Sequence, residues 1–155
     1  MDLGCGAGRH TLHLARNGFK VHGFDASASA VERTRQLLHD EGLRADLRVH
    51  DMLDPLPYRG MFFDAVLATR VIHHTLVGNI KRIVSEIDRV LKNGGYVLLQ
   101  VPEYEDHERV LREAQSTHRV LEPGTHVPLE GVEEGVPTTA SQGKNCWASF
   151  QATSQ

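Results

Sequence analysis

The sequence predicts an α/β fold in which helices cover both faces of a mostly parallel sheet, giving a three-layer sandwich. Segments of strand length alternate with segments of helical spacing over residues 1–101, and glycine or proline separates most of them. Strands that alternate with helices in this way form right-handed crossovers between parallel strands. The length of 155 residues corresponds to one domain that can bury a core.

The first elements surround a glycine-rich turn. Residues 4–8 contain three glycines and precede a short helix over residues 9–17, which a glycine C-cap ends. Residues 20–25 are predicted as a strand that ends in an acid. A serine then caps a helix over residues 27–42.

The next elements complete the alternation. Residues 47–51 alternate as a strand, and a proline-rich turn follows at 54–57. Residues 62–69 are mostly apolar and predict a buried strand. Apolar residues at helical spacing predict a helix over 80–91, and residues 96–101 predict the next strand.

The pattern weakens beyond residue 102. We expect a domain over residues 1–136 with its core in residues 1–102, a charged helix over 104–115, and a loop over 122–137 that is rich in glycine and proline. Residues 137–155 carry one charge and fit no strand or helix pattern, so we expect them to form a poorly ordered tail.

Composition excludes several classes of protein. The net charge of −3 provides no basic field for a nucleic-acid backbone, and no apolar run reaches the length of a membrane span. The first residues lack a secretory signal pattern. Two cysteines, Cys5 and Cys146, make no disulfide framework, so we expect a cytoplasmic protein.

Ligand-binding features follow three successive strands. Gly4 and Gly6 lie in the turn after the first, and such glycines let a ligand approach the backbone. Asp25 ends the second strand, where an acid can accept from both hydroxyls of a ribose. Asp51 ends the third and can accept from an adenine amino group, with Met52 packed on the ring. Ligands bind at these strand ends in open α/β sheets, so a nucleoside site is predicted.

Each feature also has a plainer explanation. The turn is compatible with an ordinary strand-to-helix connection, and Asp51 with an acid that starts a loop. Their occurrence at three successive strand ends favours the nucleoside site. NAD is disfavoured, because the third glycine of its Gly-x-Gly-x-x-Gly pattern is replaced by Arg9 in one frame and Thr11 in the other.

These motifs resemble those of the class I S-adenosylmethionine-dependent methyltransferases. The matching stretches are Asp2-Leu3-Gly4-Cys5-Gly6-Ala7-Gly8-Arg9-His10, Gly23-Phe24-Asp25-Ala26-Ser27, His50-Asp51-Met52, Phe63–His74 and Arg89–Leu99. The resemblance covers residues 1–102 and implies a Rossmann-like sandwich, S-adenosyl-L-methionine as cofactor, and methyl transfer to an unidentified acceptor. The cofactor-binding residues that it implies are Asp2, Gly4, Cys5, Gly6, Asp25, Ala26, Asp51, Met52 and Thr69.

Two departures from the family pattern are expected to affect the fold. The first strand has at most three residues, and no C-terminal strand hairpin follows the fifth strand. The sheet would therefore be trimmed at both ends. Each missing ladder hydrogen bond would cost roughly 1 kcal/mol, so we expect a marginal fold with weak or no activity in this chain alone.

The candidate catalytic residues are His73 and His74, which follow the fourth strand. An imidazole there could deprotonate an oxygen or nitrogen acceptor, although the pair could equally cap the strand or pack under a loop. Arg70 could steer an acidic acceptor or pair with Asp64 or Asp25.

Other reactive side chains receive structural interpretations. His10 and His13 share one helix face and are interpreted as surface residues, and Cys5 as a small filler. We expect no metal site, because the adjacent His73 and His74 point apart in an extended chain and no other ligand has suitable spacing.

Three functions compete. The first is methylation of a small molecule, which we favour. The second is tRNA methylation, because Val71-Ile72-His73-His74 resembles a stretch of wobble-uridine methyltransferases, although the charge does not support nucleic-acid binding. The third is a non-catalytic remnant that binds a partner, or a second copy, through exposed sheet edges. We expect no membrane association.

Overall fold

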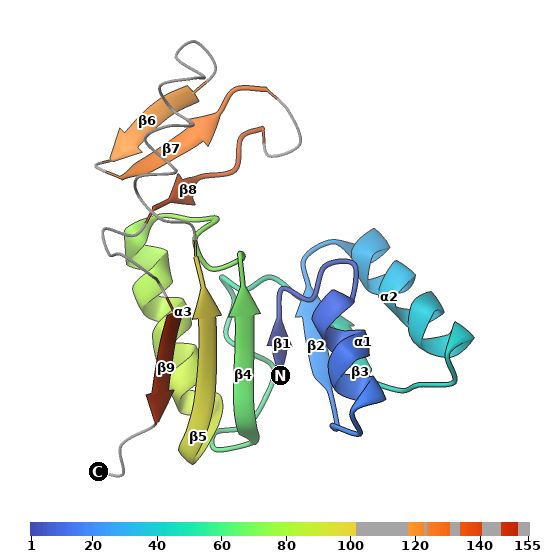
Figure 1. Cartoon of the computed structure of the whole chain (residues 1–155). Helices are drawn as coiled ribbons and strands as arrows, with labels where there is room; N and C mark the ends of the chain where they lie inside the picture. Colours follow the sequence, from blue (N-terminus) through green and yellow to red (C-terminus); the bar gives the residue numbers. More distant parts are fainter. Residues whose placement is uncertain (102–117, 123, 131–133, 141–146, 152–155) are drawn as a thin grey trace.

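The computed structural model describes residues 1–101, 118–122, 124–130, 134–140 and 147–151, and for the last range only the backbone. These residues form two sheets (Figure 1). The predicted helix over 104–115 lies outside the described residues. None of the helices in the described ranges has the length and apolar character needed to cross a bilayer.

The main sheet has six strands in the order β3-β2-β1-β4-β5-β9. Neighbours pair in parallel except β5 and β9, which are antiparallel. The strands are β1 (Asp2–Leu3), β2 (His22–Asp25), β3 (Asp46–Val49), β4 (Phe63–Thr69), β5 (Leu91–Gln100) and β9 (Trp147–Gln151). The predicted fold class is confirmed, and the strand order reverses between β1 and β4.

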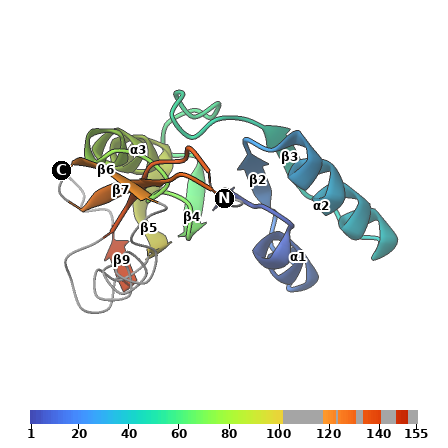
Figure 2. The ribbon, with the colours of Figure 1, turned by 90° about the horizontal axis from the view of Figure 1, so that it is seen from above.

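Helices cover both faces of this sheet (Figure 2). They are α1 (Arg9–Arg16), α2 (Ala28–Asp40) and α3 (Val77–Val90). A cluster that includes Leu12, Val31 and Leu47 joins α1 and α2 to the sheet. A larger cluster that includes Leu3 and Ile87 joins α3 to the opposite face. The two clusters make the three layers that the sequence predicts.

The short first strand is held on both sides. Asp2 and Leu3 pair with β2 and β4, and Leu3 is fully buried. The Met1 carbonyl accepts from Leu67 N at 2.8 Å, and Cys5 N donates to the Phe24 carbonyl at 2.9 Å, so the ladder continues past both ends of β1. These contacts place the turn that follows between the ends of β2 and β4.

The prediction that residues 137–155 contain no strand is wrong. Residues 138–139 form β8, and β9 pairs with β5 over the register Tyr96↔Gln151 to Gln100↔Trp147. The physical reason is that a sheet edge recruits an extended segment through backbone groups, which every residue type carries. Composition is therefore a weak guide to an added edge strand.

The loop expected over residues 122–137 also contains a strand. A second sheet has the order β6-β7-β8, with β6 (His118–Glu122), β7 (Thr125–Pro128) and β8 (Thr138–Thr139). All four residues of β7 are buried, between strands on both sides. Glycine and proline end this strand on either side, and their density hid so short a strand from the sequence pattern.

Candidate cofactor and acceptor site

The carboxyl ends of β1 to β4 meet at one edge of the sheet, where the order reverses between β1 and β4 (Figure 1). This is the position at which open α/β sheets bind ligands. The turn after β1 lies there, and its three glycines have φ values of 69° (Gly4), 50° (Gly6) and 82° (Gly8). These left-handed values are strained for residues with a Cβ.

Neighbouring side chains fill the space beside this turn. A Cβ on Gly4 would lie 2.8 Å from the Cβ of Val71, and one on Gly8 would lie 2.6 Å from Cγ2 of Thr34. The Thr34 hydroxyl donates to the Gly6 carbonyl at 2.9 Å. Thr34 was not identified from the sequence, although its place on the buried face of α2, beside Val31, is the signal that could have found it.

Asp25 joins the end of β2 to the turn. One carboxylate oxygen accepts from Gly6 N and the other from Ser27 N, each at 2.9 Å. Each oxygen of an ionised carboxylate has two lone pairs, so one on each remains for a further donor. The predicted ribose acid is therefore held against the predicted glycine turn.

The end of β3 lies beside that of β2, because His50 N donates to the Asp25 carbonyl at 3.0 Å. Asp51 is exposed, and one of its oxygens accepts from Leu53 N at 2.9 Å. Met52 is half-buried and packs against the core on the α3 side, while Ala26 is exposed. The four residues predicted at these two strand ends thus lie at one edge, with Asp51 open to solvent.

Asp2 has a different environment from that of Asp25. It is 1% exposed and accepts from the Thr11 hydroxyl at 2.6 Å, so its carboxylate ties β1 to α1. Burial raises the pKa of Asp2 above its usual 3.8, against the opposing effect of the Thr11 hydrogen bond. Direct contact between Asp2 and a cofactor remains a prediction.

The Asp2→Asn variant is expected to be more stable than the wild type at pH 7, with a larger free energy of unfolding. Because the folded pKa is raised, the contribution of Asp2 to stability is greatest below 3.8 and declines as the pH rises toward the folded value. Asparagine can still accept from Thr11 but carries no buried charge. Urea unfolding from pH 4 to pH 8 tests this, with the exposed Asp88→Asn as control. A variant less stable than the wild type at pH 7 would contradict it.

Cys5 faces the buried cluster under α1 and α2. Burial, followed by the negative charges of Asp2 and Asp25, raises the pKa of its thiol to about 12. The thiol is therefore protonated at neutral pH, which supports the interpretation of Cys5 as a filler.

His10 links α1, which follows β1, to the end of β4, at the place where the strand order reverses. Its Nδ1 lies 3.1 Å from the Thr69 hydroxyl at the end of β4, and its Nε2 lies 3.2 Å from Nη2 of Arg9. Since a guanidinium only donates, this contact requires an unprotonated Nε2, so Nδ1 carries the hydrogen and donates to Thr69. His13 is exposed, as its interpretation as a surface residue expects, whereas His10 is half-buried and contacts a strand 59 residues away, which helical spacing cannot reveal.

The predicted catalytic pair follows β4 in a short turn. His73 is 3% exposed and His74 half-buried, and their ring centroids are 4.0 Å apart. Adjacent residues thus bring their rings together here, contrary to the expectation for an extended chain. β8 packs against this turn, with Thr139 N donating to the His73 carbonyl at 2.7 Å. The alternative that the pair packs under a loop therefore describes His73 well.

Arg70 begins the same turn with an unusual backbone. Its φ is 54°, rare for a residue other than glycine, and its side chain is exposed. Asp64 pairs with Lys92 at 2.6 Å, and the Asp25 carboxylate accepts from backbone amides. Among the described contacts Arg70 pairs with neither acid, so the steering interpretation remains.

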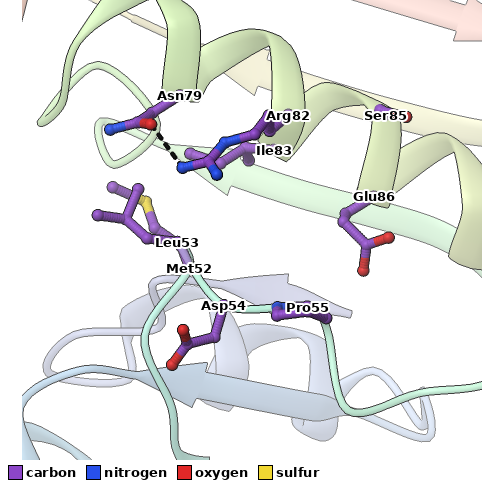
Figure 3. A pocket seen from close by; sticks show the side chains of 9 residues that line it. All are labelled: Met52, Leu53, Asp54, Pro55, Asn79, Arg82, Ile83, Ser85 and Glu86. Atoms are coloured by element: carbon purple, nitrogen blue, oxygen red, sulfur yellow. Dashed lines mark hydrogen bonds between the residues drawn. The ribbon is translucent and has the colours of Figure 1, made fainter.

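A cavity of about 300 Å³ adjoins this edge on the α3 side (Figure 3). Loop residues 52–55 line one wall, and α3 residues line the other, with Arg82 donating to Asn79 at 2.6 Å. Met52 belongs both to this cavity and to the predicted adenine contact. Among the described residues, no group of three or more His, Cys, Asp or Glu side chains is placed to hold a metal ion.

Comparison with known proteins finds similarity to methyltransferases. The methyltransferase-domain family matches residues 1–99. A sarcosine/dimethylglycine N-methyltransferase of Aphanothece halophytica is 33% identical over 109 residues, which are 69% of this chain and 39% of that protein. A tRNA (carboxymethyluridine(34)-5-O)-methyltransferase of Arabidopsis thaliana is 36% identical over 102 residues, 65% of this chain and 23% of that protein.

Solved structures share the fold. An S-adenosylmethionine-dependent methyltransferase from Methanosarcina mazei superposes with a TM-score of 0.76 at 24% identity, covering 91% of this chain and 71% of that one. This chain spans less than half the length of the first curated relatives that it matches. The family match, together with the glycine turn and the acids at the strand ends, shows that the chain belongs to the class I S-adenosylmethionine-dependent methyltransferases.

Proposed function

We propose that this chain binds S-adenosyl-L-methionine at the carboxyl ends of β1 to β4 and transfers its methyl group to a small molecule. The observation that carries the proposal is the Asp25 carboxylate, held at 2.9 Å from both Gly6 N and Ser27 N with acceptor capacity left on each oxygen. Within the left-handed glycine turn beside it, Gly6 has open space next to its Cα, so a ligand can approach the backbone there. These groups fit a ribose and the methionine part of the cofactor, respectively.

In this reaction the main task of the protein is to align the cofactor and the acceptor. When bound, S-adenosyl-L-methionine would supply an electrophilic methyl group on a sulfonium, which the lone pair of an acceptor could take up as S-adenosylhomocysteine leaves. The chain's contribution is to hold both molecules in line, which can lower the barrier by about 7–11 kcal/mol. For an acceptor that loses a proton, His74 is the candidate base, because His73 is almost completely buried.

Several observations favour a small acceptor over a nucleic acid. The net charge is −3, whereas binding to a phosphate backbone needs many cations. Relatives include enzymes named for sarcosine and dimethylglycine and for ubiquinone biosynthesis, as well as for tRNA. We propose that this chain acts in the cytoplasm, in keeping with its buried, protonated Cys5 thiol.

The test is calorimetry with S-adenosylhomocysteine, the product form of the cofactor. We expect binding by the wild type and a loss of about 1.5–3 kcal/mol in the Asp25→Ala variant, the range for hydrogen bonds to a charged group. Asp88→Ala, an exposed position on α3, is the matched control and should bind like the wild type. Unchanged affinity in Asp25→Ala would exclude Asp25 from the ribose site.

Arg70 is expected to favour acceptors that carry a carboxylate. Arg70 follows Thr69 in the sequence, and its guanidinium pairs with neither Asp64 nor Asp25, the two acids that could have neutralised its charge. With a panel of sarcosine, dimethylglycine and uncharged amines, Arg70→Gln should raise KM for the carboxylated members by about tenfold, as expected for loss of one charged hydrogen bond. Cofactor affinity should not change. An equal loss for charged and uncharged acceptors would contradict the steering role.

A partner-binding remnant is the second candidate. Tyr96 is 61% exposed and Leu98 40% exposed, on the face of β5 opposite α3. β3 and β9 end the main sheet at its two edges. Self-association of the purified chain without binding of S-adenosylhomocysteine would favour this candidate, and a monomer that binds the cofactor product would favour methyl transfer.

A further inference from the structure

The second sheet packs against the turn that contains His73 and His74. We call its strands β6, β7 and β8 the cap sheet. It lies beyond the carboxyl ends of β4 and β5, above the start of α3 (Figure 1). Its short strand β8 contacts the turn with the two histidines, which comes more than 60 residues earlier in the sequence.

Thr139 makes the central contact. Its backbone N–H donates to the His73 carbonyl at 2.7 Å, and its hydroxyl donates to the Thr75 carbonyl at 2.6 Å. With its hydrogen used in this way, the same hydroxyl can accept from that of Thr125 on β7, 2.7 Å away. All of these residues are buried, so each bond forms away from competing water.

A second contact holds the other end of the turn. The Glu122 carboxylate accepts from Val77 N, the first residue of α3, at 3.0 Å. It also lies 3.2 Å from the Thr125 hydroxyl, whose single hydrogen can go either to Glu122 or to Thr139. A carboxylate at a helix N-terminus is electrostatically favourable. The Thr138 hydroxyl also lies 3.4 Å from Nδ1 of His74. Hydrogen bonds from the cap sheet thus hold both ends of the segment from residue 73 to residue 77.

We propose that Thr139 is a positioning residue for methyl transfer, holding the turn that presents His74 to the acceptor. The inference rests on the proposed function. The turn from Arg70 to Thr75 is neither helix nor strand, so its shape depends on bonds such as those from Thr139. Val71 in this turn packs beside Gly4, but Thr139 bonds further along the turn, at His73 and Thr75. The glycine turn is also bound by Thr34 and Asp25. Thr139 should therefore affect the acceptor side and leave the cofactor side unchanged.

The test compares Thr139→Val with Thr139→Ser. Valine keeps the shape and the backbone N–H but loses both hydroxyl contacts, whereas serine retains them. We expect Thr139→Val to lower kcat on the acceptor panel by about 10- to 100-fold, the cost of a displacement of up to about 1 Å. Its affinity for S-adenosylhomocysteine should stay within about twofold of the wild type, and Thr139→Ser should recover most of the rate.

Thr34→Val is the matched contrast, because it removes a buried hydroxyl from the cofactor turn and should weaken binding of S-adenosylhomocysteine. A measurement that needs no acceptor accompanies the kinetics: amide hydrogen exchange of residues 71–77 and diethylpyrocarbonate modification of the buried His73. Both should accelerate in Thr139→Val and return toward wild type in Thr139→Ser.

The outcomes are separable. Unchanged exchange and unchanged His73 modification in a folded Thr139→Val overturn the proposal, whatever the activity. Equal losses of cofactor affinity and rate also overturn it, because they indicate general destabilisation. A wild type that binds no S-adenosylhomocysteine instead refutes the proposed function, and the exchange arm still reports whether Thr139 holds the turn.

Discussion

Replacing Gly4 with alanine is expected to destabilise the chain by about 2–5 kcal/mol and to abolish measurable binding of S-adenosylhomocysteine. The φ of 69° costs a residue with a Cβ about 1–2 kcal/mol. The added Cβ would lie 2.8 Å from the Cβ of Val71, and overpacking of this kind costs about 1–3 kcal/mol. A typical margin is about 5–15 kcal/mol, so the variant should fold poorly. Thermal unfolding and calorimetry measure the two effects.

Three further variants separate the causes. Gly18→Ala has a φ of 80° with open space around it, so it should show only the backbone cost. Gly78→Ala on α3 has open space and no such φ, so it should be neutral or slightly stabilising. Combining Gly4→Ala with Val71→Ala should relieve the clash and recover part of the lost stability. If the double variant is no better than Gly4→Ala, the contact with Val71 is not the cause.

A chain ending at Ala140 is expected to lose much of its stability, since it lacks β9. That strand pairs with five residues of β5, and loss of about four ladder bonds at roughly 1 kcal/mol each is a large part of the margin of a domain. The thermal midpoint should fall by about 10 °C or more, at about 2–4 °C per kcal/mol. The sequence pattern predicts the opposite outcome, because a poorly ordered tail over residues 137–155 would add no stability.

A chain ending at Gln151 retains β9 and serves as the control for this deletion. It should unfold within a few degrees of the complete chain. If both shortened chains melt like the complete one, β9 contributes no net stability, and this prediction is contradicted.

On the cofactor side, local pattern and strand order were enough to predict which residues lie together. Gly4, Gly6, Asp25 and Asp51 follow successive strands, and parallel strands bring their ends to one edge. The hydrogen bond from Gly6 N to Asp25 is a consequence of that arrangement. The direct roles of these residues toward a ligand remain predictions, although the structure places them together.

On the acceptor side, the sequence did not reveal contacts between residues that are remote in the chain. His10 bonds to Thr69, 59 residues away, and Thr139 bonds to the turn at His73 and Thr75. Neither partner has a periodicity or a spacing that points to the other. A hydroxyl or an imidazole can bond to many groups, so only the folded chain decides which one it meets.

The sequence by itself determined the α/β class, the order of the elements up to β5 and the edge of the sheet at which the candidate ligand-binding residues lie together. These depend on periodicity, on glycine conformations and on the rule that crossovers are right-handed, all of which act locally. Only the tertiary structure decided that β9 extends the sheet and that the cap sheet bonds to the turn from Arg70 to Thr75. The physical reason is that strand edges and buried hydroxyls bond to whichever groups lie near them in the folded chain. Local sequence patterns do not predict which groups these are.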